Sequence, residues 1–267
     1  MKIVDGFIFY NELDLLSYRL TILNDVVDYF VIVESTHTHV GNPKPLFFEE
    51  NKQKFVQFSH KIVHIIVEDL PFKAPNINYQ KSEQWLNEHF QRSAINRGFD
   101  EISLDDEDYV IVSDLDEIPD PNVLKRIRDG TKIISAAKFG MDLYYYNLVS
   151  KFENLVWNNS IILSYKTFKE LGVSCQQLRF HRCECIYPAG WHLSYFGDVK
   201  FIKNKIKEFG HVELNRPEVT TDENIEESIQ NSVDVFHRPS EKIVRIPISE
   251  NSYLPPQYDI YLSKFLG

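Results

Sequence analysis

Four short apolar runs that alternate with helical patterns constrain the fold of this chain more than any other feature of the sequence. The runs span residues 2–10, 29–34, 61–67 and 109–113. Continuous apolar runs of this length are typical of strands that are covered on both faces. Leucines at helical spacing follow the first run, and residues 82–96 have the pattern of a helix. The alternation predicts an α/β fold with a mostly parallel central sheet and helices on both faces.

The second half of the chain has a different texture. Residues 139–147 and 157–165 are predicted to be antiparallel strands, and residues 186–196 another strand with Gly190 inside it. We expect Asn11 to cap the first helix, and Asp120 to cap a helix over residues 121–129. A short helical turn before Gly172 and a helix over residues 258–266 complete the prediction. With 267 residues, no internal repeat and no linker, the chain is expected to form a single domain.

Composition narrows the possible functions. The chain has 29 basic and 39 acidic residues, a net charge of −10, which argues against nucleic-acid binding as its main activity. Three cysteines are too few, and odd in number, for a disulfide framework, and they favour a reducing compartment. Asp5 interrupts the first apolar run, so no signal peptide fits there, and no run is long enough to cross a membrane. We therefore expect a soluble, cytoplasmic protein.

The sharpest local signal is the pair Asp114 and Asp116, which follows the fourth apolar run directly. The carboxyl ends of parallel strands are where ligands bind in open α/β sheets. At a bend after the strand both carboxylates can approach one Mg²⁺ or Mn²⁺ ion, which takes its other ligands from phosphates and water. The alternative is an acidic turn before a helix, to which Glu117 and Asp120 would belong. The position behind a buried strand favours the metal site.

A second signal lies 76 residues further on, in the segment from Gly190 to Gly197. His192 leaves a predicted strand and can offer a neutral imidazole to a metal. Lys200, Lys203 and Lys205 follow, and they can neutralise phosphates. The alternative is a half-buried histidine beside Trp191, followed by a solvated lysine-rich helix.

Five segments together resemble glycosyltransferase family 17, from Glu12 to about Leu262. They are Glu12–Leu16, Val26–Ser35, Gly41–Leu46, Ser113–Pro119 and Gly190–His192. The resemblance implies a GT-A fold and an inverting transfer of a sugar, typically from UDP-GlcNAc, to a glycan or glycoprotein. It also implies a divalent metal, Mn²⁺ or Mg²⁺. Animal members have a membrane anchor and a stem that this sequence lacks, so we expect a microbial or viral enzyme with a different acceptor.

The resemblance also suggests an organisation and a ligand set. Residues 1–135 would form the nucleotide-binding half, 136–215 an acceptor and metal half with a small antiparallel element, and 216–267 a C-terminal extension. The metal ligands would be Asp114, Asp116 and His192. The residues expected to bind the nucleotide sugar are Tyr10, Glu12, Glu34, Arg92, Asp114 and Lys200.

An inverting transfer needs a general base at the acceptor hydroxyl. The candidates are Asp142, then Glu213 and Asp198; Asp142 comes first because the strand after the metal loop commonly faces the acceptor in this fold. Trp157, the tyrosines at 144–146 and Trp191 are either an acceptor platform or part of the core.

Four other functions stay open at this point. A haloacid-dehalogenase-type phosphotransferase would use Asp114 as its nucleophile, although its motif normally lies near the N-terminus. A structural zinc could be held by His181, Cys183 and Cys185, but a fourth ligand is not evident. A serine hydrolase is poorly supported, because Ser194 is not in a nucleophile elbow. The last alternative is a catalytically silent module that binds a nucleotide sugar.

Overall fold

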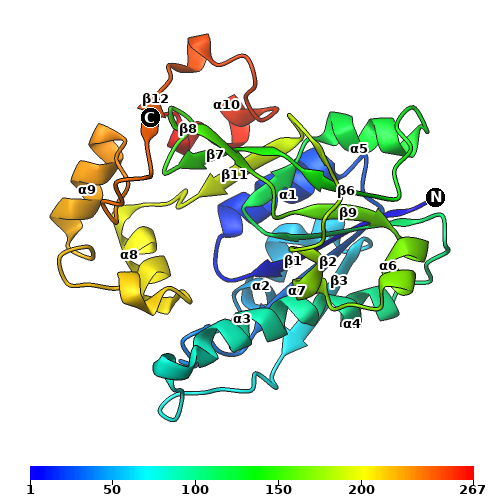
Figure 1. Cartoon of the computed structure of the whole chain (residues 1–267), viewed down its shortest axis with the longest axis horizontal. Coiled ribbons are helices and arrows are strands. Elements are labelled where there is room, and N and C mark those ends of the chain that lie inside the picture. The colour runs from blue at the N-terminus through cyan, green and yellow to red at the C-terminus, as the bar shows by residue number, and fades with distance from the viewer.

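The computed structural model describes residues 1–267 and places the predicted parallel strands in one seven-stranded sheet (Figure 1). The strand order is β10-β6-β9-β4-β1-β2-β3. β1 pairs in parallel with β2 and β4, and β2 pairs in parallel with β3, whereas β9 runs antiparallel to both β4 and β6. The strand bounds are β1 (Ile3–Phe9), β2 (Tyr29–Ser35), β3 (Ile62–Val67), β4 (Tyr109–Asp114), β6 (Ala136–Phe139), β9 (Ile161–Ser164) and β10 (Glu184–Ile186). The fold is therefore mixed α/β with a mostly parallel central sheet, as expected.

Ten α-helices accompany the strands. They are α1 (Leu13–Leu23), α2 (Phe47–Asn51), α3 (Glu83–Ser93), α4 (Ile95–Asp100), α5 (Pro121–Arg128), α6 (Tyr165–Leu171), α7 (Cys175–Leu178), α8 (Val199–Glu208), α9 (Asp222–Asn231) and α10 (Tyr258–Tyr261). Helices α1 and α5 cover one face of the main sheet, and α3 and α4 cover the other (Figure 1).

Alternation along the central strands explains why both faces are covered. In β2, Phe30 and Ile32 enter the core cluster under α1, whereas Val31 and Val33 enter the cluster under α4. Because successive side chains point to opposite faces, an apolar run with no polar residue makes both faces hydrophobic. At Gly6 of β1 a Cβ atom would lie 2.5 Å from the Ile95 side chain, so glycine permits the close approach of α4 to the sheet.

A second sheet of five strands lies beside the first, in the order β12-β8-β7-β11-β5. Its strands are β5 (Glu117–Pro119), β7 (Met141–Tyr145), β8 (Ser150–Trp157), β11 (Gly190–Ser194) and β12 (Ile243–Arg245). β11 pairs with β5, which follows directly after the acidic turn. This pairing carries the residues of β11 to the carboxyl edge of β4.

The second half of the chain differs from the sequence prediction in its pairing. The expected partners 139–147 and 157–165 meet only at one end, where Met141 of β7 pairs with Trp157 of β8; β9 instead inserts between β4 and β6 in the main sheet. The strand expected over 186–196 begins only at Gly190. Short strands carry too little pattern to specify a partner, so their sheet is set by tertiary packing.

Local helix signals are more reliable, with three exceptions. The helix expected over 258–266 is only the four-residue α10, which ends at Tyr261 and is followed by a 3₁₀ turn. Asp120 caps α5 by accepting from the Asn122 amide, and Gly172 ends α6 in the left-handed conformation, as predicted. Asn11 does not cap α1, because the N-cap position falls on Glu12, whose side chain makes no capping bond. The single helix expected over 82–96 is broken into α3 and α4 at Ala94.

Candidate active site

A pocket of about 540 Å³ lies at the carboxyl edge of the parallel strands, where the α/β pattern predicts a ligand site. The ends of β1 and β4, helices α3 and α8, and strand β11 all contribute to its wall. Polar residues of the expected site that line it are Tyr10, Glu12, Arg92, Asp114, Asp116 and His192. The structure thus gathers six of the predicted residues, from four separate segments, around one cavity.

The turn between β4 and β5 is held from below by Arg19 of α1. Arg19 Nη1 donates to the carbonyl oxygens of Asp114, Leu115 and Glu117, each at 2.9 Å. The same guanidinium pairs with the Asp5 carboxylate through Nη2 at 2.6 Å and Nε at 2.8 Å, and neither side chain is exposed. Because Arg19 donates to three backbone carbonyls of the bend, it holds the backbone path that places the acids at the pocket.

Asp114 is engaged by arginines, which is a departure from its expected place in a metal shell. Arg92 donates from Nε to Oδ1 at 2.9 Å and from Nη2 to Oδ2 at 3.1 Å. Arg179 approaches the same Oδ2 at 3.2 Å. With both oxygens held by guanidinium groups, the carboxylate is fixed in the pocket wall and is not placed to act as a nucleophile.

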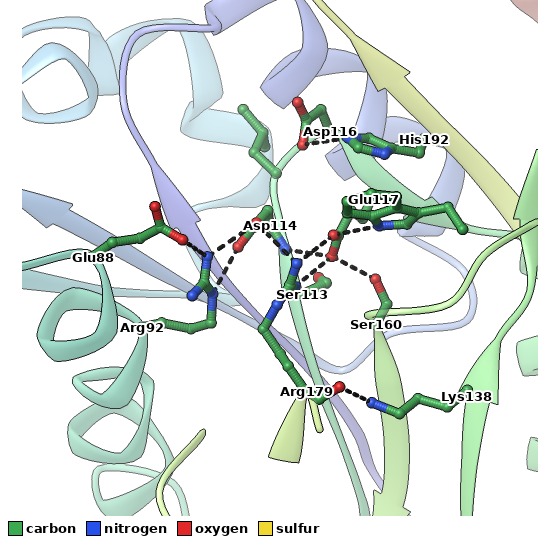
Figure 2. A network of polar contacts seen from close by, with 12 residues as sticks. Glu88, Arg92, Ser113, Asp114, Asp116, Glu117, Lys138, Ser160, Arg179 and His192 are labelled. Carbon is green, nitrogen blue, oxygen red and sulfur yellow. Dashed lines mark hydrogen bonds and ion pairs between the residues drawn. The ribbon is translucent and has the colours of Figure 1, made fainter. Parts of the chain in front are cut away.

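Asp116 and His192 both line the pocket, and their side chains point toward one another (Figure 2). His192 Nε2 lies 3.5 Å from Asp116 Oδ1, and Lys205 Nζ lies 3.0 Å from Asp116 Oδ2. Burial alone would raise the pKa of Asp116, but Lys205 and His192 together hold that pKa well below its usual range. The carboxylate is therefore ionised at all ordinary pH values, and the Lys205 ammonium is its cationic partner. Two of the three expected metal ligands meet here.

Glu117 supports this site from beneath and was not recognised in the sequence, where it reads as part of an acidic turn. Its fully buried carboxylate accepts from Arg179, at 2.7 and 2.8 Å, from the Trp157 indole at 2.7 Å and from the Ser160 hydroxyl at 2.6 Å (Figure 2). These donors lower the pKa of Glu117 against the effect of burial. Trp157 also packs against the His192 ring, with centroids 4.5 Å apart. Glu117 thus fixes both Arg179 and the support of His192.

Two of the residues expected to bind the nucleotide lie outside the pocket. Glu34 is completely buried behind it, where it accepts from the Phe48 amide and lies 3.3 Å from His64. Lys200 lines a neighbouring groove, together with Asp198, which caps α8. The end of β2 therefore supplies a structural carboxylate.

The candidates for the general base are not brought to the pocket either. Asp142 is buried in the second sheet, with Lys151 at 2.6 Å and the Tyr187 hydroxyl at 2.9 Å from its oxygens. Glu213 is exposed and accepts from His211, and Asp198 is occupied as a helix cap. A strand that follows the metal loop was expected to face the acceptor, but β7 directs Asp142 away from the cavity.

Three His, Cys, Asp or Glu side chains do not come together anywhere in the chain as a set that could hold a metal by itself. Asp114 is turned toward its arginines, so Asp116 and His192 remain as a pair. The zinc alternative at His181, Cys183 and Cys185 gains no support, and all three cysteines of the chain are unpaired.

We expect the ion pair between Glu88 and Arg92 in the pocket wall to make stability depend on pH. Burial opposes ionisation of Glu88, but Arg92, at 2.7 Å, outweighs it and lowers the pKa of Glu88 from 4.5 to about 2. A depressed carboxylate pKa stabilises the fold above the unfolded value, and this contribution is lost as pH falls from about 4.5 toward 2. The free energy of unfolding in urea should fall less steeply over this range in Glu88→Gln than in the wild type. The exposed control Glu226→Gln should keep the wild-type slope; identical slopes for all three proteins would contradict the prediction.

Comparison with known proteins identifies the family to which the sequence is similar. The sequence profile of glycosyltransferase family 17 matches residues 1–244. Two similar curated proteins are β-1,4-mannosyl-glycoprotein 4-β-N-acetylglucosaminyltransferases. The rat protein is 30% identical over 122 residues, which cover 44% of this chain and 22% of the relative. The human protein is 32% identical over 113 residues, which cover 41% and 20%. The matched segments thus span about a fifth of each relative.

A solved structure with partial likeness is that of residues 1–349 of TarS from S. aureus. It is 11% identical, with a TM-score of 0.42, and the match covers 78% of this chain and 66% of that one. None of the helices in the present chain combines the length and apolar character needed to cross a membrane.

Proposed function

The chain belongs to glycosyltransferase family 17, and we propose that it is a metal-dependent, inverting transferase of the GT-A type. The donor would be a UDP-sugar, with UDP-GlcNAc first among the candidates, and the acceptor a hydroxyl group of a glycan. The observation that carries the proposal is the pairing of Asp116 with His192 in the wall of a pocket that Arg92 and Lys205 also line. Such a site combines cation ligands with cationic side chains for a diphosphate.

The donor set fits a divalent ion. A carboxylate oxygen of Asp116 and the imidazole Nε2 of His192 converge, and both are ligands that Mn²⁺ accepts. Two protein ligands leave the remaining positions of the shell for diphosphate oxygens and water. When bound, the ion would act as a Lewis acid that neutralises charge on the departing diphosphate.

The protein's own residues account for the other requirements of the reaction. Tyr10, at the end of β1, offers a ring for a flat base, and Arg92 and Arg179 hold Asp114 where it can accept from a ribose hydroxyl. The buried guanidinium groups of Arg92 and Arg179 also favour an anionic ligand over a neutral one.

For the general base we replace the earlier candidates with Glu208 of α8. It lines the pocket, and it is the one pocket carboxylate that forms no ion pair; its Oε2 accepts from the Asn42 side chain at 3.1 Å. In an inverting transfer the acceptor oxygen forms a bond to the anomeric carbon as the bond to the diphosphate oxygen breaks. The hydroxyl proton passes to the base.

We expect UDP to bind this protein in a metal-dependent manner. In isothermal titration calorimetry, affinity for UDP with Mn²⁺ present should exceed affinity in EDTA by at least roughly ten-fold, because the ion adds a contact between the diphosphate and Asp116. A screen of nucleotide sugars for slow hydrolysis then identifies the donor. Equal UDP affinity in Mn²⁺ and in EDTA would count against a metal-dependent transferase.

A further inference from the structure

The ammonium group of Lys205 lies directly on the anionic side of the Asp116–His192 pair. Lys205 Nζ is 3.0 Å from Asp116 Oδ2 and 3.1 Å from Glu12 Oε1. Asp116 Oδ1, the other oxygen, faces His192. All these side chains are largely buried, with 16% of the lysine side chain exposed and about a tenth of each carboxylate. A cation carried by the protein is therefore bound between the Asp116 carboxylate of the proposed metal site and the neighbouring Glu12 carboxylate.

The backbone that carries Lys205 is fixed, whereas its long side chain can retract. Ile202 and Ile206 of α8 are buried on the inner side of the helix, and Asp198 caps its first turn. The Tyr195 ring centroid is 5.6 Å from Lys205 Nζ and provides a second surface for the ammonium. Release of the carboxylates thus needs a change of side-chain rotamers, without a shift of the helix.

The positive charge of Lys205 opposes the binding of a free divalent ion. Without the ammonium, Asp116 and His192 would present a carboxylate and an imidazole with no protein cation beside them, and the Glu12 carboxylate would add negative charge nearby, so a free divalent cation would be attracted. With it, an arriving ion must first break two ion pairs in a partly buried site, which costs more than at the surface. A diphosphate that arrives with the ion offers the displaced ammonium a new anionic partner, so the cost is recovered.

We propose that Lys205 keeps free divalent cations out of the Asp116–His192 site, so that the metal binds tightly only together with the nucleotide diphosphate. The inference rests on the proposed metal-dependent function and assigns the order of binding to one side chain. Lys205 is a specificity-determining residue in this scheme, and it prevents the site from being filled by an ion without its substrate.

The test is Mn²⁺ binding, measured from the electron paramagnetic resonance signal of free Mn²⁺, with and without UDP. In Lys205→Met, the affinity for Mn²⁺ without UDP should rise by about ten-fold, and the enhancement of Mn²⁺ affinity by UDP should shrink by the same factor. Lys205→Gln, which keeps a hydrogen-bond donor but no charge, should behave alike. Lys205→Arg should retain the wild-type pattern, as should Lys207→Met on the exposed face of the same helix.

Two results would overturn the inference, and they differ in what they leave standing. If the wild type binds Mn²⁺ in the presence of UDP but neither neutral variant gains affinity for Mn²⁺ alone, Lys205 does not exclude the ion, and the metal-dependent function survives. If no variant binds Mn²⁺ under either condition, the inference and the metal-dependent function both fail.

Discussion

Replacing Asp116 with asparagine is expected to lower the rate of sugar transfer by roughly 10³-fold, the scale of losing a group that stabilises charge on a leaving group. The substitution keeps the shape of the side chain but removes the charge that faces His192 and Lys205. The fold should survive, because Lys205 retains Glu12 as a partner and the turn is held by Arg19 through the backbone. Transfer is measured with the donor found in the hydrolysis screen, and thermal unfolding is recorded on the same preparation.

The comparison with Asp106→Asn makes this prediction specific. Asp106 is an exposed acid that pairs with Lys169, and its loss should change neither the rate nor the unfolding midpoint. The prediction is wrong if Asp116→Asn keeps near wild-type activity. If Asp116→Asn unfolds while Asp106→Asn does not, Asp116 is a structural carboxylate and not part of the reaction.

The four parallel strands can be predicted from sequence because each carries its own signal. The run that forms β2 is apolar on both faces, and the run that forms β4 ends in Asp114, so both element type and direction are readable locally. The strands β7, β8 and β9 are harder, because four to eight residues of mixed pattern fit either sheet. Their assignment depends on contacts between segments far apart in the chain, and no local rule contains those contacts.

The same division applies to the candidate site. Asp116 and His192 are recognisable because each follows or lies in an apolar strand with the chemistry of a metal ligand. Glu117 and Arg179 cannot be recognised from the sequence as site residues, because Glu117 resembles a helix-capping acid and Arg179 an ordinary basic residue after a short helix. Only the fold shows that Arg179 reaches Glu117 across 62 residues of sequence and is buried there. Supporting residues of this kind act through long-range pairs, which a reading by spacing does not capture.

Arg19→Met is expected to destabilise the fold by about 3–5 kcal/mol, the cost of leaving a buried charge without its partner. The substitution would strand the Asp5 carboxylate inside the core and leave the carbonyls of Asp114, Leu115 and Glu117 without their donor. Because the acidic turn would lose its support, transfer should also fall in the fraction that remains folded. Denaturation in urea measures the first effect and the specific rate at low temperature measures the second.

Two further variants separate the buried charge from the support of the turn. Asp5→Asn with Arg19→Met removes both charges, so it should recover part of the stability, yet the three carbonyls stay without a donor and transfer should stay low. The exposed pair of Arg97 and Asp69 is the matched control: Arg97→Met should cost less than about 1 kcal/mol. Recovery of full activity in the double variant would show that Arg19 serves only to neutralise Asp5. If Arg19→Met alone is as stable as Arg97→Met, the buried pair does not stabilise the fold. Loss of a guanidinium with no exposed surface should cost more free energy of unfolding than loss of an exposed one, unless water reaches the partners that it leaves behind.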